Sequence, residues 1–219
     1  MSISRNLDVI SDDILKVCKK YHKNKDDITL MAVSKTVGVD KITDAINWGC
    51  RDFGENRVEE AKEKWPELKE KYPDIKLHLI GRLQSKKIKK AIELFDFIHS
   101  VDSLKLADFL KKEMDKQKKF PKIFIQVNIG LESNKTGVEL EEIDDFINQV
   151  KNDIKLPIFG LMCIPPIDEE ASLYFALLNK IAKKHQINNL SMGMSNDYES
   201  AIALNSNYIR IGTAIFGQR

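Results

Sequence analysis

The chain has 219 residues, of which 42% are apolar, with only 10 glycines and 6 prolines. It can bury one substantial hydrophobic core, so we expect a single domain over residues 1–219. The 35 basic and 33 acidic side chains leave a formal net charge of +2. This balance disfavours a partner selected by bulk charge, such as a nucleic acid or an anionic membrane.

The three cysteines, Cys18, Cys50 and Cys163, have neither paired nor metal-type spacing. Their spacing fits a reducing compartment better than a secreted disulfide framework. Residues 1–6 lack an apolar stretch, and no run in the chain is long enough to cross a bilayer. We therefore expect a soluble cytoplasmic protein without a membrane partner.

The first predicted element is an amphipathic helix, with one face formed by Leu7, Ile10, Ile14, Val17 and Tyr21. After it, short β-type runs alternate with amphipathic stretches. We predict eight strands, at residues 29–34, 51–54, 77–80, 97–101, 123–129, 158–162, 190–193 and 208–211. Apolar residues at three-and-four spacing between these strands, for example over 88–95 and 140–150, predict helices with one buried face.

Eight strand–helix units in one domain predict a TIM-type (β/α)8 barrel, an α/β fold, with the extra N-terminal helix on its outside or at one end. An open doubly wound sheet is the alternative. In a barrel the carboxyl ends of all strands meet at one face, so residues distant in sequence converge there. The polar set that follows the predicted strands consists of Lys35, Glu55, Asn56, Gly81, Arg82, Asp102, Asn128, Met162, Cys163, Ser191, Ser195, Arg210, Gly212 and Thr213.

Lys35 takes the last inward position of the first apolar run. Burial lowers the pKa of a lysine from its usual value of about 10.4 and favours the neutral, nucleophilic amine. Such an amine forms a Schiff base with an aldehyde cofactor or substrate. The alternative is that the side chain extends to the surface from the end of its strand.

Two glycine-containing loops near the end of the chain predict a phosphate site. Residues 193–197 lead into a helix with Ser195 or Asn196 as its N-cap, which directs amide hydrogens and a hydroxyl above the helix start. Gly212 and Thr213 follow the last strand, where glycine lets the backbone approach an oxyanion. Loops after strands seven and eight commonly bind phosphate in barrels. The alternative is that Ser195 only caps its helix and Gly212 only turns the chain. Together with Lys35, these loops suggest pyridoxal phosphate.

Arg210 points into the barrel if Ile209 and Ile211 face the helices. A buried guanidinium must be paired or hydrogen-bonded. Placed against a pyridine nitrogen, it would keep that nitrogen unprotonated and weaken the ring as an electron sink. A salt bridge to Asp102 or Glu55 is the alternative.

Six sequence blocks occur in a fixed order: AVSKT at 32–36, FGEN at 53–56, IGRLQS at 80–85, GLM at 160–162, LSMGMS at 190–195 and RIGTAIFG at 210–217. Together they resemble the pyridoxal phosphate homeostasis proteins, and the match runs from Met31 to the end of the chain. The fold of that family is similar to the N-terminal barrel of alanine racemase, which favours the barrel over the open sheet.

The resemblance implies that Lys35 forms the Schiff base with pyridoxal phosphate and that Arg210 faces the pyridine nitrogen. It further implies a phosphate site formed by Ser195, Gly212 and Thr213, and a ring environment formed by Asn56, Ser191 and Met192. Val37–Gly38 replaces a common lysine–proline pair, and Arg57 stands where an aromatic residue is frequent. Both departures lie outside these contacts.

The preferred function is that of a cofactor carrier, which binds pyridoxal phosphate through Lys35 and buffers it or releases it to pyridoxal-phosphate-dependent apoenzymes. We expect a monomer without substantial amino-acid turnover, because Lys35 can serve only one face of a substrate α-carbon. The sequence also ends at Arg219, without the second domain that brings an opposing tyrosine in alanine racemase.

An enzyme is the second class: a pyridoxal-phosphate-dependent racemase of the alanine racemase type, or a Schiff-base aldolase. Such aldolases usually carry their lysine on a middle strand, and the runs 123–129 and 158–162 contain none. An RNA-binding module is the third class, suggested by the basic run 84–90, but no aromatic residues interleave that run for base stacking. His78, His99 and His185 lack metal-ligand spacing, so structural roles are favoured and no metal is expected.

Overall fold

Parallel strands, each followed by a crossover on the outside, close into a barrel in this protein. The computed structural model describes residues 2–132 and 136–218, so Met1 and Arg219, the ends of the expected domain, lie outside the described residues. The strands are β1 (Thr29–Val33), β2 (Asp52–Glu55), β3 (Lys76–Leu79), β4 (Phe97–Val101), β5 (Lys122–Asn128), β6 (Val138–Glu139), β7 (Ile158–Cys163), β8 (Asn189–Ser191) and β9 (Tyr208–Ile211).

Two pairings close the ring. β1 lies between β2 and β9, so that Met31 is in register with both Asp52 and Arg210. On the opposite side, β4 pairs with β5, which in turn pairs with β7. The two-residue β6 pairs only with the end of β5 and stays outside the ring. The predicted barrel is confirmed, and the open sheet is excluded.

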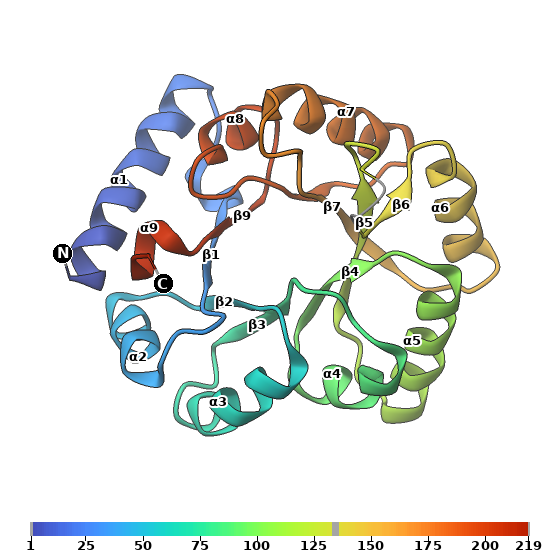
Figure 1. Cartoon of the computed structure of the whole chain (residues 1–219), viewed down its shortest axis with the longest axis horizontal. Helices are drawn as coiled ribbons and strands as arrows, with labels where there is room; N and C mark the ends of the chain where they lie inside the picture. The colour runs from blue at the N-terminus through green and yellow to red at the C-terminus, as the bar shows by residue number, and fades with distance from the viewer. Residues whose placement is uncertain (1, 133–135, 219) are drawn as a thin grey trace.

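Helices surround the barrel on its outside (Figure 1). They are α1 (Ile3–Lys20), α2 (Val39–Trp48), α3 (Val58–Lys71), α4 (Ile88–Leu94), α5 (Leu104–Gln117), α6 (Ile143–Asn152), α7 (Ala171–Lys184), α8 (Tyr198–Ala203) and α9 (Thr213–Phe216). Short 3-10 turns span Lys25–Asp27 and Ser85–Lys87. None of the described helices is both long and apolar enough to cross a membrane.

The N-terminal helix completes this outer layer. α1 packs against α2, α8 and α9, and it lies between α8 and α2 in Figure 1. α9 is only four residues long, so α1 covers the barrel where the helix of the last strand would otherwise lie. The Asn6 side-chain amide donates to the carbonyl of Ile215 at 2.8 Å. Leu7 and Ile14 are almost fully buried, which confirms the predicted apolar face.

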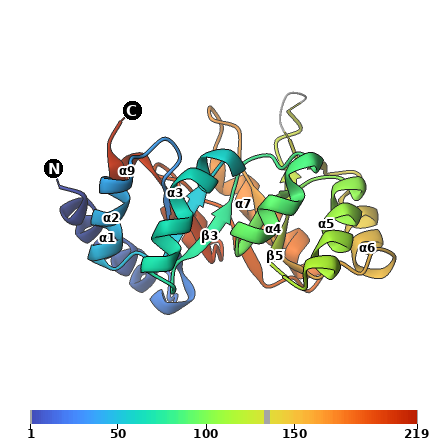
Figure 2. The ribbon, with the colours of Figure 1, turned by 90° about the horizontal axis from the view of Figure 1, so that it is seen from below.

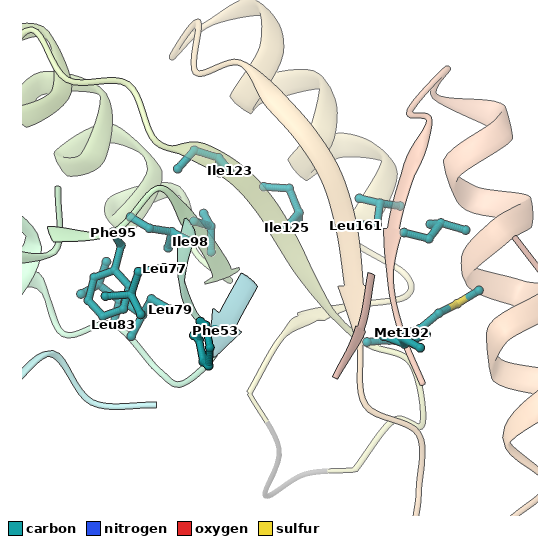
Figure 3. Packing of buried hydrophobic residues seen from close by; sticks show 14 of the residues in the cluster. Phe53, Leu77, Leu79, Leu83, Phe95, Ile98, Ile123, Ile125, Leu161 and Met192 are labelled. Atoms are coloured by element: carbon teal, nitrogen blue, oxygen red, sulfur yellow. The ribbon is translucent and has the colours of Figure 1, made fainter. Parts of the chain in front are cut away.

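Alternation along the strands divides the apolar side chains into two clusters. The larger lies between the strands and the helices and contains Phe53, Leu77, Leu79 and Ile98 (Figure 3). The smaller cluster is composed of Phe97, Phe124, Met162 and Tyr208. Because Tyr208 and Arg210 share one face of β9, this second cluster fills the interior of the barrel.

The predicted strand boundaries agree with the observed ones within one or two residues. β8, for example, ends at Ser191 rather than Gly193. β6 was not predicted, because two residues carry no periodic signal.

Candidate functional site

The loops that follow the barrel strands lie at one end of the molecule. In Figure 2, α9 and the loop after β7 lie on the same side. The predicted site residues belong to these loops and to the strand ends beneath them.

Lys35 is half-buried in a turn directly after β1. The preceding Ser34 directs its hydroxyl outward, to Glu55 Oε1 at 2.8 Å; if the alternation of β1 continues into the turn, Lys35 lies on the opposite, inner side. Thr36 has a φ of +62°, in the left-handed region that threonine rarely adopts. Its amide donates to Glu60 Oε1 at 2.5 Å, so a side chain of α3 holds the strained turn.

Lys64 of α3 fixes the same turn from outside the barrel. Its ammonium donates to the carbonyl of Ser34 at 3.0 Å and forms ion pairs with Glu55 at 2.8 Å and Glu60 at 2.9 Å. The fully buried Glu55 also accepts from Trp65 Nε1 at 3.0 Å. Glu55 therefore holds the Lys35 turn in place and does not face the predicted site.

Arg210 points into the barrel, as predicted, and is 4% exposed. Its Nη1 donates to Ser191 Oγ and its Nη2 to the carbonyl of Cys163, both at 2.9 Å. The predicted alternative, a salt bridge to Asp102 or Glu55, does not occur among the described residues. Burial lowers the pKa of the guanidinium. Its two acceptors are neutral and occupy two of its five N–H groups, so a ligand acceptor such as a pyridine nitrogen suits this position.

The loop after β8 is held by backbone bonds and by one carboxylate. Gly193 has a φ of +94°, and a Cβ there would lie 2.5 Å from that of Ala201, so glycine is required. Asp197 Oδ1 accepts from the Met194 amide at 2.5 Å. Asp197, and not Ser195 or Asn196 as predicted, is the N-cap of α8. Asp197 thus takes the cap position expected of Ser195, whose half-buried hydroxyl has no hydrogen-bond partner within the described chain.

The loop after β9 approaches the Lys35 turn. Gly212 precedes α9, whose first residue, Thr213, is exposed. The first amide hydrogens of a helix have no acceptor within it, so Thr213 offers an amide and a hydroxyl together. A cavity of about 480 Å³ is lined by Thr36 and Val37 on one side and by Gly212 and Thr213 on the other.

The remaining predicted residues differ in what they offer to a ligand. Asn56 Oδ1 is enclosed without a hydrogen-bond partner, and a Cβ on Gly81 would lie 2.2 Å from the Asn56 carbonyl, so these loops meet closely. Ser191 is buried and bonded to Arg210. The Met192 side chain is fully buried in the larger cluster (Figure 3), which leaves its backbone for ligand contact.

Two histidines inside the barrel were predicted to be only structural. His78 Nδ1 and His99 Nε2 lie 3.0 Å apart, and His99 Nδ1 lies 3.0 Å from Ser191 Oγ. Both rings are fully buried, and burial lowers both pKa values, that of His99 well below its usual range. Both histidines occupy inward-facing positions on the neighbouring strands β3 and β4, and this position in the alternation is the sequence signal that could have identified them.

The buried thiol of Cys163 is poorly suited to chemistry. Burial raises the pKa of the Cys163 thiol to about 12, so this thiol stays protonated. No cluster of metal-ligating side chains occurs in the part of the chain that the structure describes.

A second cavity of about 480 Å³ lies at the amino ends of β3 to β5. β5 begins at Lys122, one residue before the predicted run, so this middle strand does contain a lysine. That lysine lies at the amino end of the strand, with its ammonium 4.4 Å from the ring centre of Phe159. Lys122 therefore lies at the opposite end of the barrel from the loops of the predicted site.

Comparisons with known proteins agree with this fold. Residues 6–219 match the family model "Alanine racemase, N-terminal domain". The chain is 37% identical to the pyridoxal phosphate homeostasis protein of Haemophilus influenzae, covering 100% of this chain and 97% of that protein. It is 36% identical to that of Escherichia coli K12, covering 99% and 97%.

Solved structures are similar over the same length. PipY of Synechococcus elongatus PCC7942, solved with PLP bound, has a TM-score of 0.87 and 34% identity, covering 99% of this chain and 100% of that one. Alanine racemase of Clostridium difficile has a TM-score of 0.69 at 15% identity, covering 94% and 58%, and shares only the fold.

The buried histidines predict how stability depends on pH. The folded pKa values of His78 and His99 lie below the ordinary value of 6.5, so the unfolded chain binds more protons as the pH falls through that value. The free energy of unfolding should therefore decrease from about pH 7.5 to about pH 5.5, measured by urea denaturation. A flat or opposite slope would contradict neutral buried imidazoles.

Proposed function

Because the chain belongs to the pyridoxal phosphate homeostasis protein family, within the alanine racemase N-terminal domain fold, we propose that it binds pyridoxal phosphate at the carboxyl end of its barrel and acts as an intracellular carrier of that cofactor. The observation that carries the proposal most directly is the shared cavity between the Lys35 turn and Gly212–Thr213. Lys35 itself is not among the residues that line this cavity, which brings the turn containing that lysine next to the loop proposed to bind the anion.

Lys35 is the covalent attachment point in this proposal. The aldehyde of pyridoxal phosphate, when bound, supplies the carbon with which a lysine amine forms a Schiff base. The chain's part is to hold the amine: the Lys64 contacts with Ser34, Glu55 and Glu60 fix the backbone on either side of Lys35. This support is a reason to expect one defined lysine rather than several.

Arg210 is the partner of the ring nitrogen. Its burial and its neutral acceptors leave a positive charge that an uncharged pyridine nitrogen can approach as a hydrogen-bond acceptor. The enclosed Oδ1 of Asn56, without a partner, supports a further polar contact at the ring edge. Ser191 and the backbone at Met192 complete the proposed ring environment.

The phosphate is held by Ser195, Gly212 and Thr213. The unpartnered hydroxyl of Ser195 and the amide and hydroxyl of Thr213 are donors suited to a phosphate. Thr213 is exposed and Ser195 is half-buried, so this end of the cofactor lies where solvent and a partner protein can reach it.

This arrangement fits a protein that carries pyridoxal phosphate rather than one that turns over amino acids. An accessible phosphate end supports release to pyridoxal-phosphate-dependent apoenzymes, and the donor next to the ring nitrogen keeps the ring a poor electron sink. Three unpaired cysteines support a reducing, cytoplasmic location. The chain acts on the concentration of free cofactor and not on an amino acid.

The first test locates the Schiff base. Borohydride reduction of the protein loaded with pyridoxal phosphate should fix the cofactor to Lys35, identified by peptide mass spectrometry, because only an imine is reduced there. Lys35→Ala should abolish the visible absorbance band, whereas Lys86→Ala, which removes an exposed lysine, should retain it. An adduct on Lys86 or on another surface lysine would show that the site is assigned wrongly.

The second test concerns the phosphate. Each charge-assisted hydrogen bond from Ser195 or Thr213 should contribute about 1.5 to 3 kcal/mol, so either alanine substitution should weaken cofactor retention about tenfold or more. Retention is measured by equilibrium dialysis. Thr43→Ala is the control, because its hydroxyl bonds within α2 to Val39. Unchanged retention in the Ser195→Ala, Thr213→Ala double variant would exclude this phosphate site.

The third test separates a carrier from a racemase. Racemisation needs an acid and a base on opposite faces of the substrate α-carbon, and loss of such assistance typically costs about 10² to 10⁴ in rate. Incubation of the loaded protein with L-alanine and other L-amino acids, followed by chiral chromatography, should show only slow formation of the D-isomer. Turnover near about one per second, within the usual enzyme range, would support the racemase instead.

A further inference from the structure

Four hydrogen bonds cross the barrel interior from the amino end of β2 to Arg210. Asp52 Oδ1 lies 2.8 Å from His78 Nε2, and His78 Nδ1 lies 3.0 Å from His99 Nε2. His99 Nδ1 lies 3.0 Å from Ser191 Oγ, which accepts from Arg210 Nη1 at 2.9 Å. We call these five residues the interior hydrogen-bond chain. Five different strands contribute to it.

We infer that the hydrogen bonds of the interior hydrogen-bond chain can be donated in only one direction, from Arg210 toward Asp52. We also infer that Asp52, His78 and His99 are positioning residues that act through Ser191 on Arg210. The inference rests on the proposed function only for the role of Arg210 toward a cofactor. The direction of the chain is a property of the protein alone.

The direction follows from what each group can donate. A carboxylate only accepts, so His78 must carry its proton on Nε2 to bond Asp52. A neutral His78 then presents Nδ1 as an acceptor, so His99 must carry its proton on Nε2 as well. His99 Nδ1 is left as an acceptor for the hydroxyl proton of Ser191.

Arg210 matches this direction from the other end. A guanidinium only donates, and the Ser191 oxygen has lone pairs available once its proton points to His99. Every member of the chain is then satisfied, with both imidazoles neutral. The reverse direction would leave the Asp52 carboxylate facing an imidazole lone pair and the Ser191 proton without its histidine acceptor.

The surroundings keep both imidazoles neutral. His78 stacks on Phe97 and His99 on Phe124, each with ring centres 4.1 Å apart, and burial lowers both pKa values. The charged groups that act on the pair are Asp52, Asp96 and Lys122 at the amino end of the barrel and Arg210 at the other. The Tyr208 ring also packs against both histidines.

A fixed direction has a consequence at the cofactor end. The Ser191 hydroxyl is committed to His99 and presents its lone pairs to Arg210, so the guanidinium has a fixed acceptor in Ser191 and keeps other N–H groups for a ligand. Asp52, whose side chain is 25% exposed, thereby sets the orientation of the Ser191 hydroxyl, with which it makes no direct hydrogen bond. A role confined to packing would produce no such dependence.

Nitrogen-15 NMR of the histidine rings in the full chain tests the direction, with and without added pyridoxal phosphate. At about pH 7.5, above the ordinary histidine pKa, His78 and His99 should both show the proton on Nε2. Asp52→Ala should replace this single form by a mixture at His78 and also at His99, which Asp52 does not touch. Ser191→Ala should leave both rings as they are, because Asp52 still fixes the direction.

Asp96→Ala is the matched control. It removes a carboxylate of the same charge that acts on His78 but bonds the Leu77 amide and Lys69 instead of an imidazole, so both rings should keep their protons on Nε2. A proton on Nδ1 of His99 in the unaltered chain would overturn the inference. So would an Asp52→Ala spectrum in which only His78 responds.

Cofactor affinity provides the second readout. Ser191→Ala should weaken binding of pyridoxal phosphate about tenfold, the loss of one hydrogen bond to a charged group, and shift its absorbance band. Ser191→Thr, which keeps a hydroxyl, should restore both. Unchanged affinity and absorbance in Ser191→Ala would overturn the action on Arg210. If the unaltered chain bound no pyridoxal phosphate, the proposed function would fail, whereas the NMR result would still decide the direction.

Discussion

A permanent positive charge inside the barrel is the constraint on which the interior depends. A guanidinium removed from water must have hydrogen-bond acceptors, and β7 and β8 supply them to Arg210 as the carbonyl of Cys163 and the hydroxyl of Ser191. Neither hydrogen-bond acceptor carries a charge, so the field of Arg210 is offset only in part, by the Asp197 carboxylate. That field contributes to the lowered pKa of His99, and it favours a ligand that brings an acceptor or a negative charge.

At the strand ends, alternation directs the side chains that hold the backbone outward, and the side chains proposed to contact a ligand inward. Ser34 and Glu55 face outward and connect β1 and β2 to α3 through Lys64. If the alternation continues into the turn, Lys35, next to Ser34, follows on the inner side. Because neighbouring residues have opposite faces, α3 can hold the backbone of the turn firmly without occupying the space above the barrel.

The sequence predicted the barrel because its signal is repeated along the whole chain, and it predicted the inward Arg210 from the flanking Ile209 and Ile211. The role of Glu55 could not be predicted, since a carboxylate at a strand end looks the same whether it faces the site or a helix. The contact between His78 and His99 was missed because it depends on the register in which β3 and β4 pair. Asp197 displaced Ser195 as the helix cap, because three neighbouring polar residues could each have capped α8.

The position of α1 has a consequence for how the molecule is made. Its apolar face is covered by α8 and α9 as well as by α2, and Asn6 bonds Ile215, 209 positions later. β1 likewise needs β9 as a neighbour. During synthesis, the apolar face of α1 therefore stays exposed until the segments near the end of the chain have been made. Contacts between such distant segments slow folding, and exposed apolar surface invites aggregation, so this segment is where a nascent chain would most benefit from a chaperone.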